Sequence, residues 1–263
     1  MPESASLQPR HESIIRLLQS FRQITVAELT QRLGVSQVTI RKDLTHLEEQ
    51  GLVQRTHGSA RLAQNIGVLP SVQDRATSHA EEKQAIVHRA LELIAGDDAV
   101  AIDAGSTNLM LARELYAKPL RIFTNSLDIA SSLRSSLSVS LTLSGGSFRR
   151  EAGSFIGPIA VEAVEKLRFD IALIGATSFT ARGEFFTQNS IEGSVKQAML
   201  RSAARRVILA DSSKFNARGF SRFAASGEVD LLITDEGFTQ ADALRREGVE
   251  VLLVSPYSPS SEM

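Results

Sequence analysis

The sequence predicts an α/β protein in which a small N-terminal domain precedes a doubly wound, mostly parallel α/β domain. Two observations carry this prediction. Residues 25–58 place helix caps, leucine periodicity and a glycine turn at the spacing of a helix pair followed by a hairpin. Beyond residue 79, apolar runs alternate with helix-like segments, which is typical of a parallel sheet covered on both faces. We expect domains at 7–62 and 79–257, joined by a linker at 63–78.

The helix pair is predicted from its caps. Thr25 and Glu28 form a capping-box pattern, so the first helix begins at residue 26, and Gly34 ends it with a sharp turn. Ser36 is a favourable N-cap for the second helix. Apolar residues recur at helical spacing along that helix and form its buried stripe: Ile40, Leu44 and Leu47.

A third helix and a hairpin complete the first domain. A helix at about residues 12–19 supplies apolar side chains to a three-helix core: Ile14, Ile15, Leu17 and Leu18. Gly51 closes the second helix of the pair. Leu52–Arg55 and Ala60–Leu62 then read as two short strands around a turn at 57–59. A helix pair followed by such a hairpin is the pattern of a winged helix-turn-helix.

Polar and basic side chains of the second helix and the wing indicate a DNA-binding surface. Those away from the buried stripe can reach base edges and phosphates in a major groove: Gln37, Thr39, Arg41, Lys42 and Thr45. At the wing, Arg55 and His57 would contact the adjacent backbone or minor groove. We expect double-stranded DNA as the partner because the turn, the basic helix and the wing agree. The alternative, a helical domain that binds a protein, predicts no salt-dependent affinity for DNA.

Composition excludes several classes of protein. The 263 residues include no cysteine, so neither disulfide nor thiolate chemistry is available. No apolar leader and no stretch approaching about 18 apolar residues occurs, so we expect a cytoplasmic protein without a membrane partner. No two histidines lie three or four residues apart, and neither GxxxxGK[ST] nor GxGxxG occurs. We therefore expect no metal and no cofactor.

Seven apolar runs of the second domain read as strands: Ala99–Asp103, Arg121–Asn125, Ser138–Ser144, Phe169–Gly175, Arg206–Asp211, Asp230–Asp235 and Val249–Val254. Ligands of such sheets bind beyond the carboxyl ends of the strands. Polar clusters follow five of these ends, in the segments Asp103–Asn108, Thr124–Ser126, Ser144–Ser147, Gly175–Ser178 and Asp211–Lys214. One such cluster alone is commonly an ordinary αβ turn, whereas five in one domain indicate a site for a small anionic polyol.

The first cluster is the most informative. Gly105 lets the backbone approach a ligand, and Ser106 and Thr107 offer hydroxyl and N–H groups at a helix N-terminus, which is an anion site. An Asp-x-Gly-Ser-Thr segment also opens the phosphate loop of actin-like sugar kinases. Here it follows a helix and a lone strand, and no second Asp-x-Gly-Gly loop appears, which disfavours a kinase.

The ordered motifs resemble those of the DeoR family of bacterial transcriptional regulators. In the first domain the motifs are Val26-Ala-Glu-Leu, Thr39-Ile-Arg-Lys-Asp-Leu, Gly51-Leu and Arg55-Thr-His-Gly. In the second they are Asp103-Ala-Gly-Ser-Thr, Thr124-Asn-Ser-Leu, Leu143-Ser-Gly-Gly, Phe169-Asp-Ile-Ala-Leu-Ile-Gly, Val195-Lys and Ala210-Asp-Ser-Ser-Lys-Phe. The resemblance covers about residues 7 to 254. It implies that the second domain has a fold like that of ribose-5-phosphate isomerase and binds a phosphorylated sugar.

The resemblance also adds residues to both sites. It makes Ser36 an operator contact beside Thr39, Arg41 and Lys42. For the effector site, the resemblance and the strand-end clusters together give these residues: Asp103, Gly105, Ser106, Thr107, Asn108, Thr124, Asn125, Ser126, Gly145, Gly146, Arg149, Gly175, Lys196 and Lys214. The sequence departs from the family pattern at Gly58-Ser59, where Gly-Gly is common, and at Ala176-Thr-Ser, where glycine is usual.

The expected function is that of a homo-oligomeric repressor of carbohydrate-metabolism genes, controlled by a phosphorylated sugar. The rival is an isomerase-like enzyme with a DNA-binding head, which needs a carboxylate base beside the substrate C–H. Isomerases of this type carry acidic residues after the strand that here ends in Gly175, and this chain has Ala176, Thr177 and Ser178. Asp103 and Glu192 remain as possible bases, but we expect a regulator that is not an enzyme.

Overall fold

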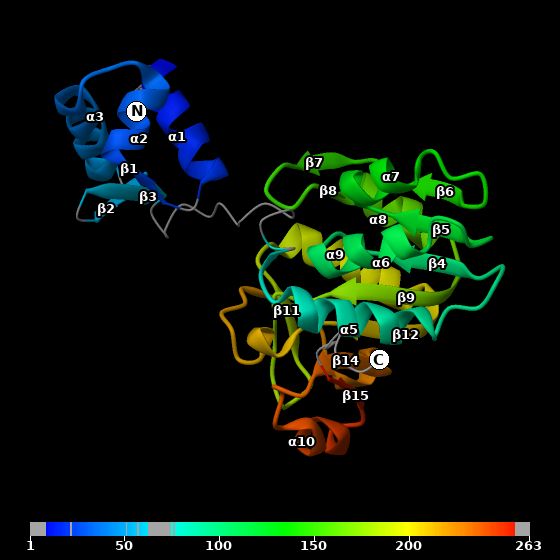
Figure 1. The fold of residues 1–263 in the computed structure, drawn as a ribbon. Helices are drawn as coiled ribbons and strands as arrows, with labels where there is room; N and C mark the ends of the chain where they lie inside the picture. The colour runs from blue at the N-terminus through cyan, green and yellow to red at the C-terminus, as the bar shows by residue number, and fades with distance from the viewer. Residues whose placement is uncertain are drawn as a thin grey trace, which may run out of the picture. The chain divides into compact units, whose positions relative to one another are not determined.

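The computed structural model describes residues 9–21, 23–50, 52–56, 58–62, 75 and 77–255, and forms two compact units, Met1–Pro70 and Ser71–Met263 (Figure 1). Most of the predicted linker lies outside the described residues, as do Gly51, His57 and the tail from residue 256. Arg75, Thr77 and Ser78, which the sequence assigns to the linker, fall in the second unit. Within the described ranges, no helix has both the length and the apolar character needed to cross a membrane.

The first unit is a three-helix fold with a small sheet, as the sequence predicts. Its elements are α1 (Pro9–Ser20), β1 (Ile24–Thr25), α2 (Val26–Leu33), α3 (Gln37–Glu49), β2 (Val53–Thr56) and β3 (Ser59–Leu62). The predicted capping box forms, because the Thr25 N–H donates to Glu28 Oε2 at 2.8 Å and the Glu28 N–H donates to Thr25 Oγ1 at 3.2 Å. Gly34 ends α2 in the left-handed conformation, with φ of +66°.

The core of the first unit comes from the predicted apolar faces. Ile14, Leu29, Ile40, Leu44 and Leu47 are fully buried and pack in one cluster. The hairpin is framed by a strand that the sequence analysis missed, since β1 pairs with β3 through Ile24 and Ala60. Two residues are too few to show a period, which is why this strand escaped detection.

An ion pair between a partly exposed arginine and a buried aspartate joins α1 to α3. Asp43 lies on the buried side of α3, where Arg10 donates two hydrogen bonds to its carboxylate at 2.6 and 2.9 Å. His11 Nε2 lies 3.2 Å from the same carboxylate. The Arg10 hydrogen bond, with His11, lowers the pKa of Asp43 below its ordinary value of 3.8 against the opposing effect of burial. The pair fixes α1 against α3 and so orients the latter.

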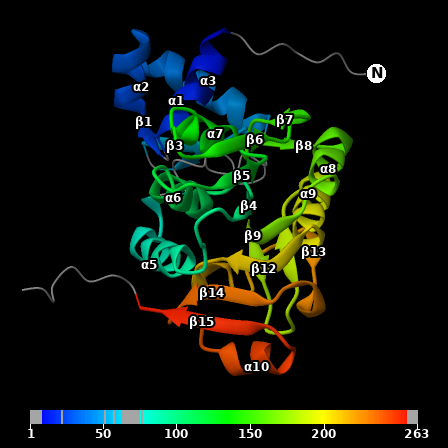
Figure 2. The same ribbon diagram turned by 90° about the vertical axis from the view of Figure 1, so that its right-hand side faces the viewer.

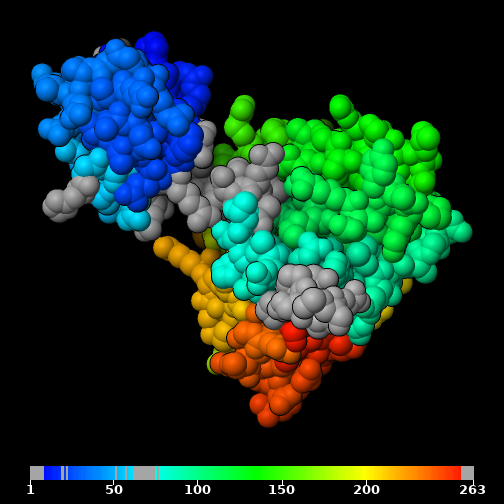
Figure 3. Space-filling view, in the orientation of Figure 1, coloured from blue at the N-terminus to red at the C-terminus, as the bar shows by residue number. Residues whose placement is uncertain are grey.

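The second unit is built on a seven-stranded sheet, as predicted. The order is β15-β14-β12-β9-β4-β5-β6, and all neighbouring strands are parallel. The bounds are β4 (Ala99–Ile102), β5 (Arg121–Thr124), β6 (Ser140–Leu143), β9 (Phe169–Gly175), β12 (Ala203–Leu209), β14 (Leu231–Asp235) and β15 (Glu250–Val254). Figure 2 shows these strands stacked in that order, and in Figure 3 the same unit runs from its green β5–β7 end to its red β15 end.

Helices cover both faces of this sheet (Figure 2). The helices are α5 (Ala80–Leu91), α6 (Ser106–Glu114), α7 (Leu127–Leu133), α8 (Pro158–Glu165), α9 (Ser190–Arg201) and α10 (Ala241–Arg246). Side chains of α5, α6 and α7 pack with Ile102 and Leu173 on one face. Side chains of α8, α9 and α10 pack with Ala172 and Ile174 on the other. Successive residues of one strand therefore serve opposite faces, which explains the continuous apolar runs.

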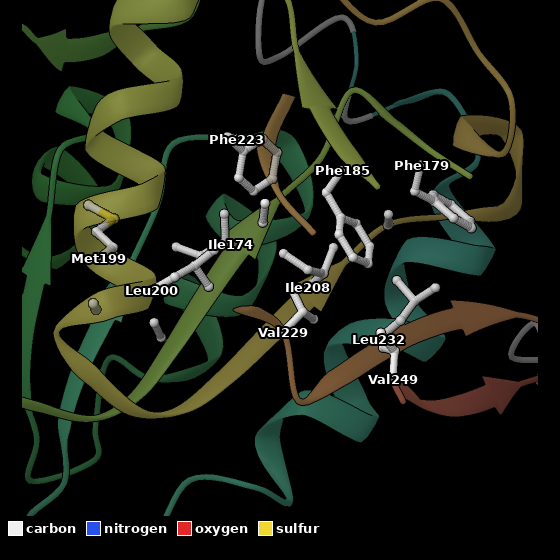
Figure 4. Close-up of a cluster of buried hydrophobic side chains, with 14 of the residues drawn as sticks. Ile174, Phe179, Phe185, Met199, Leu200, Ile208, Phe223, Val229, Leu232 and Val249 are labelled. Carbon is white, nitrogen blue, oxygen red and sulfur yellow. The ribbon is translucent and has the colours of Figure 1, made fainter. Parts of the chain in front are cut away.

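Two small sheets were not anticipated. One is the hairpin of β7 (Ser147–Arg149) and β8 (Ser154–Ile156). The other joins β10 (Ser178–Phe179), β11 (Phe185–Thr187) and β13 (Ser221–Ala224). Phe179, Phe185 and Phe223 of the second extend the apolar cluster shown in Figure 4. The expected alternation of strand and helix also fails once: between β12 and β14 the chain forms two 3₁₀ turns, η1 (Ser212–Lys214) and η2 (Ser226–Glu228), around β13.

The sequence order of the strands reverses between β4 and β9. From β4 the chain proceeds outward through β5 and β6, whereas from β9 it proceeds the other way through β12, β14 and β15. The helix that follows β4 lies on one face and the helix that precedes β12 lies on the other. This is a topological switch point, where a crevice opens at the carboxyl ends of the two central strands.

Candidate nucleic-acid interface and effector site

The exposed face of α3 carries the predicted DNA contacts. Gln37, Arg41 and Lys42 are exposed, while Thr39 is half-buried. Ser36 is exposed, but its hydroxyl already accepts the Thr39 N–H at 3.2 Å and caps the helix. A shallow hollow of about 400 Å³ lies on this face, lined by Val38, Arg41, Lys42, Thr45, His46 and Glu49.

Val38 is a surface residue that sequence reasoning missed. Its side chain is 64% exposed between the basic positions of α3. The sequence did contain a signal for it, because Val38 is apolar but does not fall at the helical spacing of the buried stripe. An exposed apolar group of this kind is the type that contacts the thymine methyl group in DNA-binding proteins, so the face carries an apolar group among its polar ones.

The wing side chain Arg55 is fixed against α3. Its Nη1 donates to Thr45 Oγ1 at 2.7 Å, and its backbone N–H donates to Glu48 Oε1 at 3.0 Å. Two predicted contact residues, Arg55 and Thr45, are therefore bonded to each other. Predicted contact His57 lies outside the described residues. Helix and wing thus form one continuous polar surface.

At the switch point of the second unit, three predicted site residues meet. Asp103 follows β4 and is completely buried. Its Oδ2 accepts a hydrogen bond from the Gly175 N–H at 3.3 Å and one from Lys196 Nζ. Lys196 Nζ also donates to the Gly175 carbonyl at 2.9 Å. The central strands and α9 are therefore joined by a buried ion pair.

A second acid and base flank this ion pair. Glu192, buried on α9, accepts a hydrogen bond from Arg149 Nη1, and its Oε1 lies 4.0 Å from Lys196 Nζ. Burial raises the pKa of Asp103, and Glu192 raises it further, against the opposing effects of Lys196 and the Gly175 N–H. The site is a compact array of alternating charges in which both carboxylates have cationic partners.

Two buried acceptors in this array have no partner among the described groups: Asp103 Oδ1 and Asn108 Oδ1. The Asn108 amide is oriented, because its Nδ2 donates to the carbonyls of Asp103 and Leu173 at 2.8 and 3.0 Å. An unsatisfied buried acceptor is uncommon in folded proteins, so each of these two oxygens is a candidate position for a donor from a bound molecule. Hydroxyl groups of a polyol are suitable donors.

The start of α6 adds an electropositive element. The helix begins at Ser106, and no side chain caps it at Gly105. Ser106 and Thr107 are buried at this start, and N–H groups in the first turn of a helix have no intrahelical acceptor. The geometry is suited to an anion.

Three other predicted site residues make hydrogen bonds within the loops that frame the site. Thr124 Oγ1 accepts the Ser126 N–H at 3.0 Å, and Asn125 Oδ1 accepts the Ala104 N–H at 3.0 Å. Ser126 also caps α7, accepting the Ile129 N–H at 3.3 Å. These buried groups hold the loops after β4 and β5 together.

Gly145 and Gly146 connect β6 to β7 with φ of +65° and +109°. A side chain at Gly146 would bring Cβ to 2.7 Å from the carbonyl oxygen of Ile156, which no residue but glycine avoids. These glycines therefore shape the loop that carries Arg149.

Further basic residues lie near Asp211, and sequence reasoning found only some of them. Predicted residue Lys214 lies half-buried in η1. Lys83 of α5 is buried, in the electrostatic field of Asp211 and Lys214, and burial lowers its pKa. Lys83 lies on the buried face of α5 with Ile86 and Val87. A lysine among the apolar residues of a helix face was therefore a signal in the sequence that was overlooked. In the described part of the chain, no three His, Asp or Glu residues are grouped to hold a metal.

Together the two units define the class of transcriptional regulators that combine a winged helix-turn-helix with an α/β sensor unit. Two family models match the chain: the DeoR-like helix-turn-helix domain at residues 10–65 and the DeoR C terminal sensor domain at residues 78–236. The chain belongs to the DeoR family of transcriptional regulators.

Curated relatives agree with this assignment. The putative aga operon transcriptional repressor of Escherichia coli O157:H7 is 33% identical over 251 residues, or 93% of each chain. The L-fucose operon activator of Escherichia coli strain K12 is 33% identical over 229 residues, which cover 86% of this chain and 94% of the activator. Both proteins are named as regulators.

Among solved structures, ribose 5-phosphate isomerase A of Methanocaldococcus jannaschii aligns with 52% of this chain and 55% of its own, at a TM-score of 0.40 and 16% identity. A likeness at this level carries no information on activity.

Proposed function

We propose that this chain represses carbohydrate-metabolism genes and that a phosphorylated sugar, bound at the switch point, releases it from operator DNA. One observation carries the proposal: unpartnered buried acceptors lie beside basic side chains and an open helix start. Acceptors suit the hydroxyl groups of a sugar, and the cations and N–H groups suit its phosphate. The names of the aga operon and L-fucose operon relatives support the carbohydrate class.

On the DNA side, α3 enters a major groove and the wing lies against the adjacent backbone. Arg41 and Lys42 supply exposed positive charge, and Gln37 supplies donors and acceptors for base edges. The unit has little excess charge, since residues 1–62 contain eight Lys/Arg against six Asp/Glu. We therefore propose that two or more subunits present paired heads to a repeated or palindromic operator.

On the effector side, Asp103 and Asn108 accept from sugar hydroxyl groups, while the start of α6 and Lys214 bind the phosphate. The sugar phosphate binds one arrangement of the oligomer more tightly than the other. This difference shifts DNA binding, with a coupling free energy that is typically about 1–3 kcal/mol. Repression is the proposed sign because a bound oligomer can block a promoter without specialised activating contacts.

We do not expect isomerase activity from this site. Both candidate bases are engaged, Asp103 by Lys196 and Glu192 by Arg149. A carboxylate that is held by a cationic side chain is not free to approach a substrate C–H, and a general base must lie within hydrogen-bond reach of the proton that it removes. Incubation with pentose and hexose phosphates, followed by product analysis, checks this expectation, and turnover would contradict it.

The proposal is tested with duplex DNA from upstream of the chain's own gene and a panel of sugar phosphates. Arg41→Ala should weaken operator binding and reduce its salt dependence, without changing the thermal shift that a sugar phosphate produces. Lys214→Ala should leave operator binding intact and abolish release by the ligand. Release of the Lys214→Ala protein at the wild-type ligand concentration would count against the assigned site.

A further inference from the structure

Arg75 is a charged residue that the predicted site does not include. It lies only five residues beyond Pro70, the last residue of the first unit, and belongs to the second unit. Its Nε is buried and has no hydrogen-bond partner among the described groups. A guanidinium nitrogen that is removed from water without an acceptor is uncommon, because each such group loses a hydrogen bond to solvent.

The guanidinium lies within electrostatic range of the strand-end array. Glu192, Arg149 and Asp103 all act on its charge, and burial lowers its pKa. Arginine remains protonated in proteins, so Arg75 keeps its charge there. Arg75 and Arg149 are therefore two cations within electrostatic range of the carboxylates of Asp103 and Glu192.

The backbone of Arg75 is fixed to the body of the second unit. Lys83 Nζ of α5 donates to the carbonyls of Arg75 and Ser78, the first at 2.5 Å. Lys83 is itself buried and faces Asp211 and Lys214. The position of Arg75 is therefore defined by the same basic cluster that borders the site.

Lys83 and Arg149 differ from Arg75 in one respect. Lys83 is occupied by two carbonyl acceptors, and Arg149 by Glu192 and Glu151. Arg75 has a buried donor, its Nε, for which the described part of the chain offers no acceptor. An anionic ligand supplies such an acceptor and repays the desolvation of the guanidinium.

We infer that Arg75 binds the anionic group of the effector and thereby ties site occupancy to the segment that leads from the DNA-binding unit. The inference rests on the proposed function, since it assigns a further contact residue to that site. Because residue 75 lies so close in sequence to the first unit, its capture by a ligand acts on the connection between the units. Arg75 then has two roles: it contacts the ligand, and it passes the effect of ligand binding to the segment that leads to the DNA-binding unit.

The test uses the full-length chain and four probes: ribose 5-phosphate, glucose 6-phosphate, glycerol 3-phosphate and inorganic phosphate. Thermal shifts are measured for the wild type, Arg75→Ala, Arg75→Lys and a control, Arg113→Ala, whose arginine is exposed on α6. We expect Arg75→Ala to need at least tenfold more of whichever probe stabilises the wild type, since a charge-assisted hydrogen bond is lost. Arg75→Lys should recover part of the response, and Arg113→Ala should match the wild type.

Hydrogen exchange gives a second measurement. The same probe should slow exchange of amides at residues 77–83 in the wild type and the control, but not in Arg75→Ala. Operator affinity without ligand should be the same in all four proteins.

If wild type and Arg75→Ala need the same probe concentration for the same thermal shift, the inference is overturned and the proposed function is left standing. A loss of stability without ligand in Arg75→Ala, unrepaired by Arg75→Lys, would also overturn it, since the residue would then be structural. A wild type that responds to no probe would reject the inference and the proposed function together.

Discussion

The buried ion pair of Lys196 and Asp103 gives a prediction whose magnitude follows from the structure. Lys196→Met replaces the ammonium by an apolar side chain of similar length. It leaves the Asp103 carboxylate completely buried, with the Gly175 N–H at 3.3 Å as the remaining donor to Oδ2. Removing one partner of a buried pair typically destabilises by about 3–5 kcal/mol. For a unit of this size that corresponds to a fall of roughly 6–20 °C in the unfolding temperature.

The effect should depend on pH with a definite sign. Burial already raises the pKa of Asp103, and the substitution removes the cation that opposes this shift. A carboxyl group with a raised pKa stabilises the folded state below its ordinary pKa, and this stabilisation is lost as pH rises through the raised value. Lys196→Met should therefore be less destabilising at acidic pH, closer to the raised pKa of Asp103, than at pH 8.

Differential scanning calorimetry of the full-length chain measures this, because it can separate the transitions of two units. The double variant Asp103→Asn, Lys196→Met removes the buried charge and should recover most of the lost stability at pH 8. A shift below about 2 °C at pH 8, where roughly 6–20 °C is expected, or an equal shift at pH 5 and pH 8, would refute the assignment of a buried, mutually dependent pair.

Two further predictions concern the first unit. Ser36→Ala removes the cap of α3 and should destabilise this unit by about 1 kcal/mol, seen as a lower first calorimetric transition, while Ser36→Asp should not. Asp43→Asn removes the carboxylate that binds Arg10 and His11. The pKa of Asp43 is lowered below 3.8. The wild type should therefore be more stable than Asp43→Asn above pH 3.8, and this difference in the free energy of unfolding should disappear as pH falls through the lowered pKa. Hydrogen exchange along α1 checks this, and a difference that persists in acid would contradict it.

Local signals made the first unit predictable. The capping pair Thr25 and Glu28, the glycine turn at Gly34 and the cap at Ser36 are short-range features, and each forms as expected. In the second unit, continuous apolar runs identified all seven strands of the main sheet, and β9 has the predicted bounds. A strand buried on both faces is apolar along its whole length, so its sequence signal is strong.

Features that depend on long-range contacts were not predictable. The strands β10, β11 and β13 are two to four residues long, and β11 pairs with a distant part of the chain, Phe185 lying opposite Ala224. Their phenylalanines face a core that exists only after folding. Sequence reasoning likewise found Lys196 and Asp103 as separate motifs, and the structure brings them into one ion pair.

The roles of the site residues divide in a way that the sequence does not reveal. Thr124, Asn125 and Ser126 have the composition of a ligand loop, but their polar groups are bonded within the fold. Arg75 and Lys83 lie outside any recognised motif, and the structure places them beside the basic side of the site. Hydrogen-bond satisfaction depends on the folded structure, and it separates the groups that are bonded within the fold from those that have no partner among the described residues.

Fluorescence anisotropy of labelled upstream DNA, titrated with protein and then with each sugar phosphate, tests the central claim most directly. We predict that at least one sugar phosphate raises the dissociation constant for DNA by about 5- to 150-fold, which corresponds to a coupling free energy of about 1–3 kcal/mol. The corresponding unphosphorylated sugar should have little effect. DNA affinity that is the same with every sugar phosphate as without would contradict the account.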